Sequence, residues 1–412
     1  MFIFSIIVVT MVRYRCIFSW LILGTCFHFV YSASRAGCTF NVLNNANEKY
    51  LPVMLTNHSS KYELIVPEHG QIHLKSGEGI TFVCPDKNYL VLTNSNFTYA
   101  TCIQGTNLKI FRSTYNFDSF LCSKSIRGSV QKTKERCGNR NGEIINIGYK
   151  VTKRYFKPLI SVCYDEKNGK TLYSQHVIHG EEVAYTSKFK ERPGFSTDGL
   201  AKDVSANLAY KRAYQKSTFS SLLGSSREAE QYINTKSYLS RGHLSPDADF
   251  LFASSQLTSY FYINTCPQWQ SINGGNWVRL ESAVRRVADK YQSTFLIVTG
   301  THDVLELPDV NDNPTEMYLV SKHKLPVPKF VWKIMLDEDS GKGIAFVSLN
   351  NPFVEEITED EQLCSDICEK YGWGSKYYSD FSKGYIYCCE VNELRETIDT
   401  IPTLNVNGIL RA

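Results

Sequence analysis

Ser240-Arg241-Gly242-His243-Leu244-Ser245-Pro246 opens the stretch of sequence that decides the fold. An apolar run at 257–263 follows, and then come Asn264-Thr265-Cys266-Pro267-Gln268 and Asn273-Gly274-Gly275-Asn276-Trp277. The run at 258–263 is rich in β-branched and aromatic residues, which favours a strand. From Asn276 onward, apolar residues recur at helical spacing, at Trp277, Leu280, Val284 and Val287. The stretch therefore predicts a strand leading to an Arg-Gly-His turn, a long loop, a second strand and a helix.

The polar residues of this stretch suit the hydrolysis of phosphodiesters. The neutral imidazole of His243, with an ordinary pKa near ~6.5, can take a proton from water. The Asn273 amide and the Glu281 carboxylate are hard oxygen donors of the kind that a largely hydrated Mg²⁺ prefers. Arg241 and Arg285 offer bidentate forks to a phosphate. Because Glu281 and Arg285 are four residues apart, they share one face of the predicted helix.

Each of these residues also has an ordinary structural interpretation. A histidine in a glycine-containing turn is usually a polar loop residue. Asn273-Gly274-Gly275 is equally typical of a turn and helix cap. Glu281 and Arg285 could form a surface ion pair worth ~0.3–0.5 kcal/mol. The functional interpretation is favoured because all of them occur together at consistent spacing.

This pattern resembles the DNA/RNA non-specific endonuclease family, the endonuclease G-like ββα-metal nucleases, and most closely its secreted arthropod-type branch. The resemblance covers about residues 138–391. It implies that His243 is the general base and Asn273 the single direct ligand of Mg²⁺, for which Mn²⁺ is an acceptable substitute. The other roles that it implies are the motif arginine for Arg241, a supporting asparagine for Asn264, a carboxylate holding metal-bound water for Glu281, and a phosphate contact for Arg285.

Ser240 departs from the family pattern, in which an acidic residue commonly precedes Arg-Gly-His. A serine hydroxyl can accept a hydrogen bond from Arg241 but carries no charge. An acidic neighbour would raise the pKa of His243 by favouring its cation. We therefore expect His243 to be neutral at a somewhat lower pH than in the family, and Ser240→Asp to move the acid limb of the pH–rate profile upward.

Substrate contacts must come from local basic clusters, because the chain as a whole is nearly neutral. It has 45 basic and 41 acidic residues, and Arg13 and Arg15 lie in a leader-like segment. By the resemblance, Arg192 matches a loop arginine that grips phosphate. Arg279 lies near Arg285 and Arg286 and is a second candidate for binding substrate. Lys211, Arg212 and Lys216 are better explained as a solvated face.

Residues 1–32 have the charged-then-apolar order of a secretory signal peptide, with cleavage expected near Ser32. An uncleaved membrane anchor is the alternative, because the apolar segment is long. Two of the 13 cysteines lie in this leader, and 11 remain, a density typical of an oxidising compartment. Eleven is odd, so at least one thiol is free or paired between chains. Asn57 and Asn96 begin glycosylation sequons.

The rest of the chain predicts an α+β protein with two domains. Residues 38–125 form a small β-rich N-terminal domain with strands at 72–74, 80–84 and 89–93 and no catalytic constellation. A linker is expected at 126–140, a ββα-metal nuclease domain with a central antiparallel sheet at 141–395, and a C-terminal tail at 396–412. Within the nuclease domain we expect a hairpin of 159–164 with 171–174, helices at 201–214 and 226–233, and strands at 295–299, 327–335 and 343–349. His176, His179 and His302 are expected to be structural.

These observations predict a secreted, Mg²⁺-dependent endonuclease that hydrolyses phosphodiester bonds of DNA, RNA or both with low sequence specificity and leaves 5′ phosphates. Nucleic acid is then the substrate, and no membrane is bound once the signal is removed. The alternatives are a secreted nucleic-acid-binding protein of the same fold with weak or no catalysis, and a structural secreted protein in which the site residues are incidental. The sequence does not indicate the oligomeric state or the role of the N-terminal domain.

Overall fold

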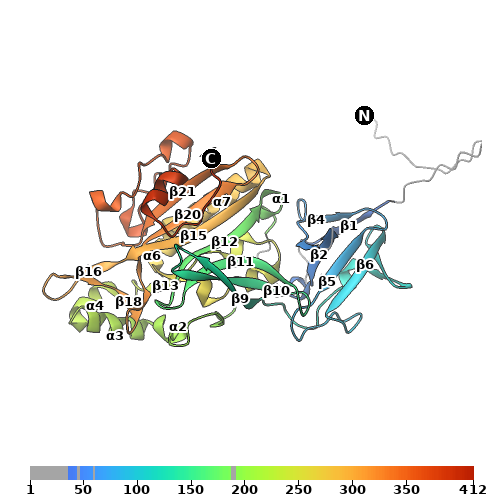
Figure 1. Cartoon of the computed structure of the whole chain (residues 1–412), viewed down its shortest axis with the longest axis horizontal. Helices are drawn as coiled ribbons and strands as arrows, with labels where there is room; N and C mark the ends of the chain where they lie inside the picture. Colours follow the sequence, from blue (N-terminus) through green and yellow to red (C-terminus); the bar gives the residue numbers. More distant parts are fainter. Residues whose placement is uncertain (1–35, 44–46, 59–60, 187–191) are drawn as a thin grey trace, which may run out of the picture.

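The computed structural model describes residues 36–43, 47–58, 61–186 and 192–412, which form an N-terminal lobe and a larger lobe (Figure 1). The predicted signal peptide at 1–32 lies outside these residues. Across the described parts of the chain, we find no helix with the length and apolar character needed to span a bilayer.

The N-terminal lobe is a β-rich unit, as predicted. Its six-stranded antiparallel sheet has the order β3-β2-β5-β6-β7-β8, and β1 pairs with β4. Along β6 and β7 buried and exposed side chains alternate, so one face of the sheet covers a core that includes the stacked rings of Phe40 and Phe117. Strands 72–74 and 80–84 are confirmed, but 89–93 forms a turn. The bounds are β1 Cys38–Asn41, β2 Val53–His58, β3 Lys61–Leu64, β4 Gln71–Leu74, β5 Gly79–Val83, β6 Phe97–Gln104, β7 Asn107–Ile110 and β8 Ser113–Asn116.

Ten of the eleven cysteines beyond the leader form disulfides, and Cys266 is free and buried. This confirms the expectation of an unpaired thiol. Two bridges lie in the N-terminal lobe and three in the larger lobe: Cys38–Cys102, Cys84–Cys122, Cys137–Cys163, Cys364–Cys389 and Cys368–Cys388. Of the two sequons, Asn96 is exposed, whereas Asn57-His58-Ser59 ends outside the described residues.

Replacing Cys38 and Cys102 together by alanine is expected to lower the free energy of unfolding by ~2–5 kcal/mol, because their bridge closes a loop of 64 residues. Replacing Cys368 and Cys388, which close only 20 residues, should cost about 1 kcal/mol less by loop entropy alone. Denaturant unfolding of each double variant measures both losses. An unchanged midpoint for the first variant would contradict the prediction.

The larger lobe is built on a nine-stranded sheet of order β22-β21-β20-β15-β12-β11-β10-β9, with β23 parallel to β21. The predicted hairpin and the three later strands are confirmed as β11–β12, β15, β20 and β21. The predicted linker is wrong at Ser129–Cys137, because that segment is β9 and pairs with β10. Its charged residues lie on the exposed face of an edge strand, which hid the strand pattern. The bounds are β9 Ser129–Cys137, β10 Gly142–Lys150, β11 Phe156–Asp165, β12 Lys170–His179, β15 Thr294–Val304, β20 Pro328–Asp337, β21 Lys342–Leu349, β22 Ile386–Cys389 and β23 Gly408–Ile409.

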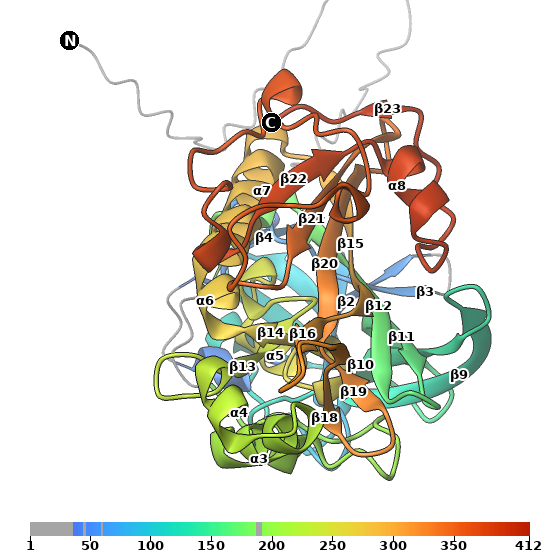
Figure 2. The ribbon, with the colours of Figure 1, turned by 90° about the vertical axis from the view of Figure 1, so that its left-hand side faces the viewer.

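Helices cover both faces of this sheet (Figure 2). The helix α7, Val278–Tyr291, packs Leu280 and Val284 against one face, and α8, Val391–Thr397, packs Leu394 against the other. The predicted helix from Asn276 is thus confirmed as α7. The tail at 396–412 is part of the fold, since β23 pairs with β21 and the indole of Trp373 donates to the carbonyl of Leu410.

Short helices and ribbons complete the larger lobe. The helix predicted at 201–214 is broken into α2 and the start of α3, and the helix at 226–233 is confirmed as α4. Two small ribbons, β16–β17 and β18–β19, extend from the sheet. The bounds are α1 Gly180–Val183, α2 Ala206–Ala209, α3 Arg212–Leu222, α4 Ser226–Tyr232, β16 Glu306–Pro308, β17 Pro314–Glu316, β18 Tyr318–Val320 and β19 Lys324–Pro326.

The stretch that decides the fold forms a ββα unit, with its strands placed differently from the prediction. Arg-Gly-His lies inside β13, Leu239–His243, which pairs with β14, Thr265–Trp269. The predicted strand at 258–263 is instead the end of α5, Ala253–Thr258, followed by a turn. Since this run is buried on all sides, it lacks the alternation that distinguishes a strand from a buried helix. After β14 the chain continues through α6, Gln270–Ile272, and a π-type turn, Asn273–Trp277, into α7.

Candidate active site

A hydrogen bond joins the strand of the Arg-Gly-His motif to the start of α7. The amide nitrogen Nδ2 of Asn273 donates to Oγ of Ser240 at 3.1 Å, and this hydroxyl donates to the backbone carbonyl of Gln268 at 3.0 Å. Nε of Arg241, from which a serine hydroxyl could also accept, donates to Tyr262 instead. Ser240 acts on the orientation of Asn273 and leaves the Oδ1 of that amide for another partner.

His243 lies among aromatic rings. Its imidazole is 5.0 Å from the ring centroids of both Phe195 and Tyr260, and Nε2 is buried without a hydrogen-bond partner among the described residues. Burial lowers the pKa of His243 to about 4; the charge of Asp247 raises it, and that of Arg192 lowers it further. His243 is thus neutral at physiological pH, the state required of a general base. Burial is the largest cause of this shift, and the effect expected of Ser240 in place of an acidic residue stays a prediction.

Arg241 is enclosed by the same aromatic cluster. Its Nε donates to the hydroxyl of Tyr262 at 3.1 Å, and its guanidinium carbon lies 4.9 Å from the ring centroid of Tyr210 and 5.6 Å from that of Phe195. Tyr262 in turn donates to Asn207 at 2.7 Å. Cation–π contacts of this kind restrain a guanidinium while preserving its charge, so Arg241 is held beside His243, on the same side of the strand.

Asn264 is fully buried and satisfies all of its hydrogen-bonding groups within the protein. Its Oδ1 accepts from the backbone N–H of Ser245 and from the hydroxyl of Ser174, at 3.0 Å each. Its Nδ2 donates to the carbonyls of Ser245 and Ser259. Asn264 therefore fixes the backbone immediately after His243, which makes it a positioning residue and not one that touches substrate.

Asn273 and Glu281 form the candidate metal site, and their donors fit Mg²⁺. Oδ1 of Asn273 is a neutral oxygen turned away from Ser240, and Glu281 supplies a carboxylate from the first turn of α7. Burial raises the pKa of Glu281 to about 7, the charge of Lys333 opposes this, and a bound cation would favour the ionised carboxylate. Gly275 allows the turn between them, since a Cβ at this position would lie 2.7 Å from the carbonyl oxygen of Lys383.

A cleft of about 490 Å³ lies beside α7, and its lining includes three arginines and two aspartates, Asp247 and Asp289. Arg192, Arg285 and Arg286 all contribute to its wall, together with Asp247 and Ser282. The structure thus brings the predicted Arg192 and Arg285 together. Arg279 is not among the described residues that line the cleft. Its guanidinium carbon lies 4.0 Å from the ring centroid of Tyr377, on the same helical stripe as Ser282 and Arg286 but nearer the start of α7.

Comparisons with known proteins identify the family of this chain. The model of the DNA/RNA non-specific endonuclease family matches residues 140–394. A salivary endonuclease of Lutzomyia longipalpis is 32% identical over 92% of this chain and 87% of its own length. The chain belongs to the DNA/RNA non-specific endonuclease family. Salivary protein Tsal1 of Glossina morsitans morsitans is 26% identical over 92% of this chain and 95% of its own. The mitochondrial nuclease EXOG of Danio rerio is 30% identical over 35% of this chain and 43% of its own.

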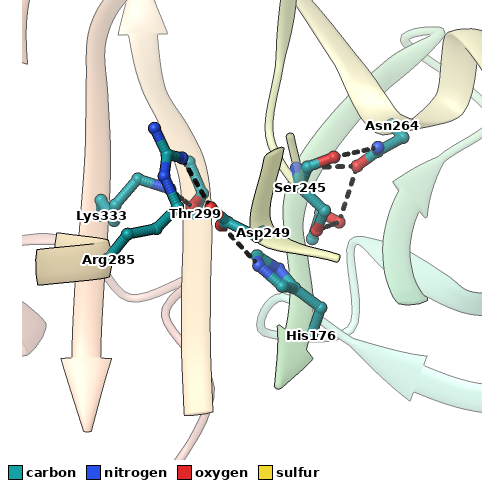
Figure 3. A network of polar contacts seen from close by, with 8 residues as sticks. His176, Ser245, Asp249, Asn264, Arg285, Thr299 and Lys333 are labelled. Carbon is teal, nitrogen blue, oxygen red and sulfur yellow. Dashed lines mark hydrogen bonds and ion pairs between the residues drawn. The ribbon is translucent and has the colours of Figure 1, made fainter. Parts of the chain in front are cut away.

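Figure 3 shows a buried polar network near the candidate active site that was not predicted from the sequence. Lys333 is 1% exposed, and its Nζ donates to the hydroxyl of Thr299 at 2.6 Å. Asp249, 5% exposed, lies 2.9 Å from Nε2 of His176 through Oδ2, and its Oδ1 accepts from Nη1 of Arg285 at 2.8 Å. Residues Ser174, Thr299 and Lys333 occupy one register across β12, β15 and β20. In the sequence, the only indication of this network is the occurrence of polar residues within otherwise apolar strands.

Proposed function

We propose that this protein is a secreted, Mg²⁺-dependent endonuclease that hydrolyses phosphodiester bonds of DNA, RNA or both with low sequence specificity. The observation that carries the proposal is the β13–β14–α7 unit. In it the Ser240–Asn273 bond ties an amide that can supply an oxygen donor to the strand of the neutral His243, and the Asp249–Arg285 pair holds an arginine in the wall of the cleft. Membership of the nuclease family supports the same class of reaction.

In this proposal His243 takes a proton from the attacking water, and Arg241 and Arg285 face the extra negative charge that develops on the phosphate in the transition state. Asn273, with Glu281 acting through water, would hold Mg²⁺, and the bound ion would supply Lewis acidity to the leaving 3′ oxygen. Because water and not a 2′ hydroxyl is the nucleophile, the reaction accepts DNA as well as RNA and leaves 5′ phosphates.

Low sequence specificity follows from the kind of contact that the site offers. Arg192 and Arg285 at the cleft present charge suited to phosphate oxygens, and Arg279 is proposed to extend this surface toward the start of α7. Contacts to phosphate fix the register of a nucleic acid but carry no sequence information.

Secretion is supported by four kinds of observation. The leader-like segment precedes a chain with five disulfides, which persist in oxidising compartments. The sequon at Asn96 is exposed, as glycosylation requires. The relatives named above from Lutzomyia longipalpis and Glossina morsitans morsitans are salivary proteins.

Nicking of supercoiled plasmid tests the proposal. The purified protein should cleave plasmid DNA or RNA with Mg²⁺ and stop in excess chelator, and the ends should carry 5′ phosphate. Cleavage unaffected by chelator would overturn the metal dependence. A gel shift in chelator combined with no cleavage under any metal would favour the binding protein of the same fold, and absence of both would favour a structural role.

Arg192→Ala is expected to weaken binding of duplex DNA measured in chelator and to reduce the slope of log K against log salt by about 0.9, the value for one phosphate contact on B-DNA. Arg136→Ala is the matched control, because Arg136 is an exposed arginine on the edge strand β9 that pairs with Glu143 at 2.8 Å. Fluorescence anisotropy across a salt series measures both slopes. Equal slopes for Arg192→Ala and the parent would remove Arg192 from the binding surface.

A further inference from the structure

The segment that follows His243 runs between the two lobes. Leu251 is 4% exposed and belongs to the core of the N-terminal lobe, together with Tyr149 and Val151 from the larger lobe. The hydroxyls of Tyr149 and Ser255 lie 3.1 Å apart. Two further contacts join the lobes nearby, a hydrogen bond from Tyr155 to the carbonyl of Tyr62 and the ion pair of Lys157 with Glu63. The segment is thus fixed at Leu251 by a lobe that contains no candidate catalytic residue.

Asp249 lies two residues before Leu251, and its carboxylate accepts a hydrogen bond from Arg285. Burial alone would raise the pKa of the Asp249 carboxyl, but the hydrogen bond from His176 and the charge of Arg285 outweigh it, so the pKa is lowered. Burial lowers the pKa of His176, so its neutral ring donates from Nε2 to Oδ2 of Asp249. One carboxylate oxygen is therefore fixed by His176 on β12, and the other is bonded to the arginine on α7 (Figure 3).

We propose that Asp249 is the positioning residue that holds Arg285 toward the substrate phosphate, and that the N-terminal lobe fixes Asp249 by enclosing Leu251 in its core. The proposal rests on the phosphate-binding role of Arg285 in the proposed function. In this proposal the N-terminal lobe affects the reaction rate by positioning Asp249, although it contributes no catalytic residue. Two residues span at most about 7 Å, so a shift of the backbone at Leu251 also shifts the backbone at Asp249.

The physical basis is the cost of misplacing a charged group. A long arginine side chain has several rotamers, and a fixed carboxylate oxygen that accepts from Nη1 favours one of them. A buried carboxylate is stable only where donors and cations satisfy it, as His176 and Arg285 do here. If Asp249 lost its charge or its backbone moved, Arg285 would no longer be held in one rotamer. Its guanidinium could then move away from the position that the phosphate requires. A misplacement of about 1 Å can cost ~10²-fold in rate.

A double-mutant cycle tests the first half of the proposal. Asp249→Asn keeps the size of the side chain and is expected to lower kcat/KM for plasmid cleavage roughly 10- to 100-fold. In an Arg285→Ala background the same change should cost less than about twofold, because its effect passes through Arg285. Asp337→Asn is the matched control, since Asp337 is also buried on β20 but bonds only to its own turn. Equal losses in both backgrounds would overturn the positioning role.

The same cycle repeated with binding of a labelled duplex DNA in chelator separates this proposal from the proposed function. If the parent protein does not cleave, the nuclease assignment fails, and coupling between Asp249 and Arg285 in binding still decides the positioning role. If the parent cleaves but the binding and rate effects are additive, only the positioning role fails.

Leu251→Ala tests the second half, with Leu108→Ala as its control. Leu108 is fully buried in the same core but lies on β7, away from the segment that follows His243. Both variants should unfold at a lower temperature than the parent. At a temperature where both are folded, only Leu251→Ala should lower kcat/KM, by severalfold, and it should add nothing in the Asp249→Asn background. Equal rates for the two variants would overturn the role of the N-terminal lobe.

Discussion

His243→Asn is expected to lower kcat by ~10²–10⁴-fold while leaving binding of nucleic acid in chelator nearly unchanged. Asparagine keeps a polar side chain between Phe195 and Tyr260 but cannot take a proton from water. The loss therefore reports the general base alone, and kcat should fall with little change in KM. Single-turnover cleavage of plasmid and a thermal unfolding curve measure the two effects separately.

His302→Asn is the control for this substitution. His302 is a partly buried histidine on β15 next to Asp303, outside the set of described residues around the cleft. It should cleave at the parent rate. A folded His243→Asn variant that also cleaves at the parent rate would show that another group is the base.

The pH–rate profile carries the same prediction further. Burial lowers the pKa of His243 to about 4, and a base works only when unprotonated, so at saturating Mg²⁺, where the bound cation keeps Glu281 ionised, activity should be lost only near pH 4. An exposed histidine would instead lose activity near its ordinary pKa of ~6.5. Because the charge of Asp247 raises the pKa of His243, Asp247→Asn should move the acid limb still lower. A limb that remains near 6.5 in both proteins would contradict the burial argument.

Regular periodicity made much of the fold predictable. Leu280, Val284 and Val287 pack α7 on one face of the sheet, as their helical spacing indicates. The hairpin β11–β12 follows from turn residues between two apolar runs. In the site, Asn273 and Arg285 were predicted from one segment, and the structure bonds each to a residue of that same segment, Asn273 to Ser240 and Arg285 to Asp249. Site residues that lie within one segment of the sequence can be predicted without knowledge of the tertiary structure.

The parts that sequence reasoning missed depend on contacts between distant segments. Asp249 and His176 are 73 residues apart, and nothing in either local pattern indicates their pairing. Lys333 lies within an apolar strand. Its burial is explained only by the tertiary structure, in which it donates to Thr299 and lies near the charges of Glu281 and Asp249. The strand β9 was taken for a linker because its exposed face is charged. The hydrogen bond from Asn273 to the Ser240 hydroxyl likewise joins residues 33 positions apart, which no local pattern indicates.

Asn273→Ala is expected to raise the Mg²⁺ concentration needed for half-maximal cleavage by more than the ~10–100-fold typical of changes in outer-shell partners, because it removes a direct ligand oxygen. Some activity should return at high Mg²⁺, since the remaining groups of the site are unchanged. Titration of cleavage with Mg²⁺, and of metal binding by calorimetry without nucleic acid, measures the effect in two independent ways.

Ser240→Ala distinguishes two roles of Asn273, metal binding through Oδ1 and the hydrogen bond that Nδ2 donates to Ser240. It removes the 3.1 Å hydrogen bond that Asn273→Ala also removes, but it keeps Oδ1 of Asn273. If Oδ1 binds the metal, Ser240→Ala should shift the Mg²⁺ requirement only within the ~10–100-fold range of outer-shell changes, and less than Asn273→Ala does. If the two variants shift it equally, the role of Asn273 is to hold β13 against the start of α7, and the metal ligand must be sought elsewhere, with Glu281 first. Ser240→Asp would then act on that tether too and not on the acid limb of His243.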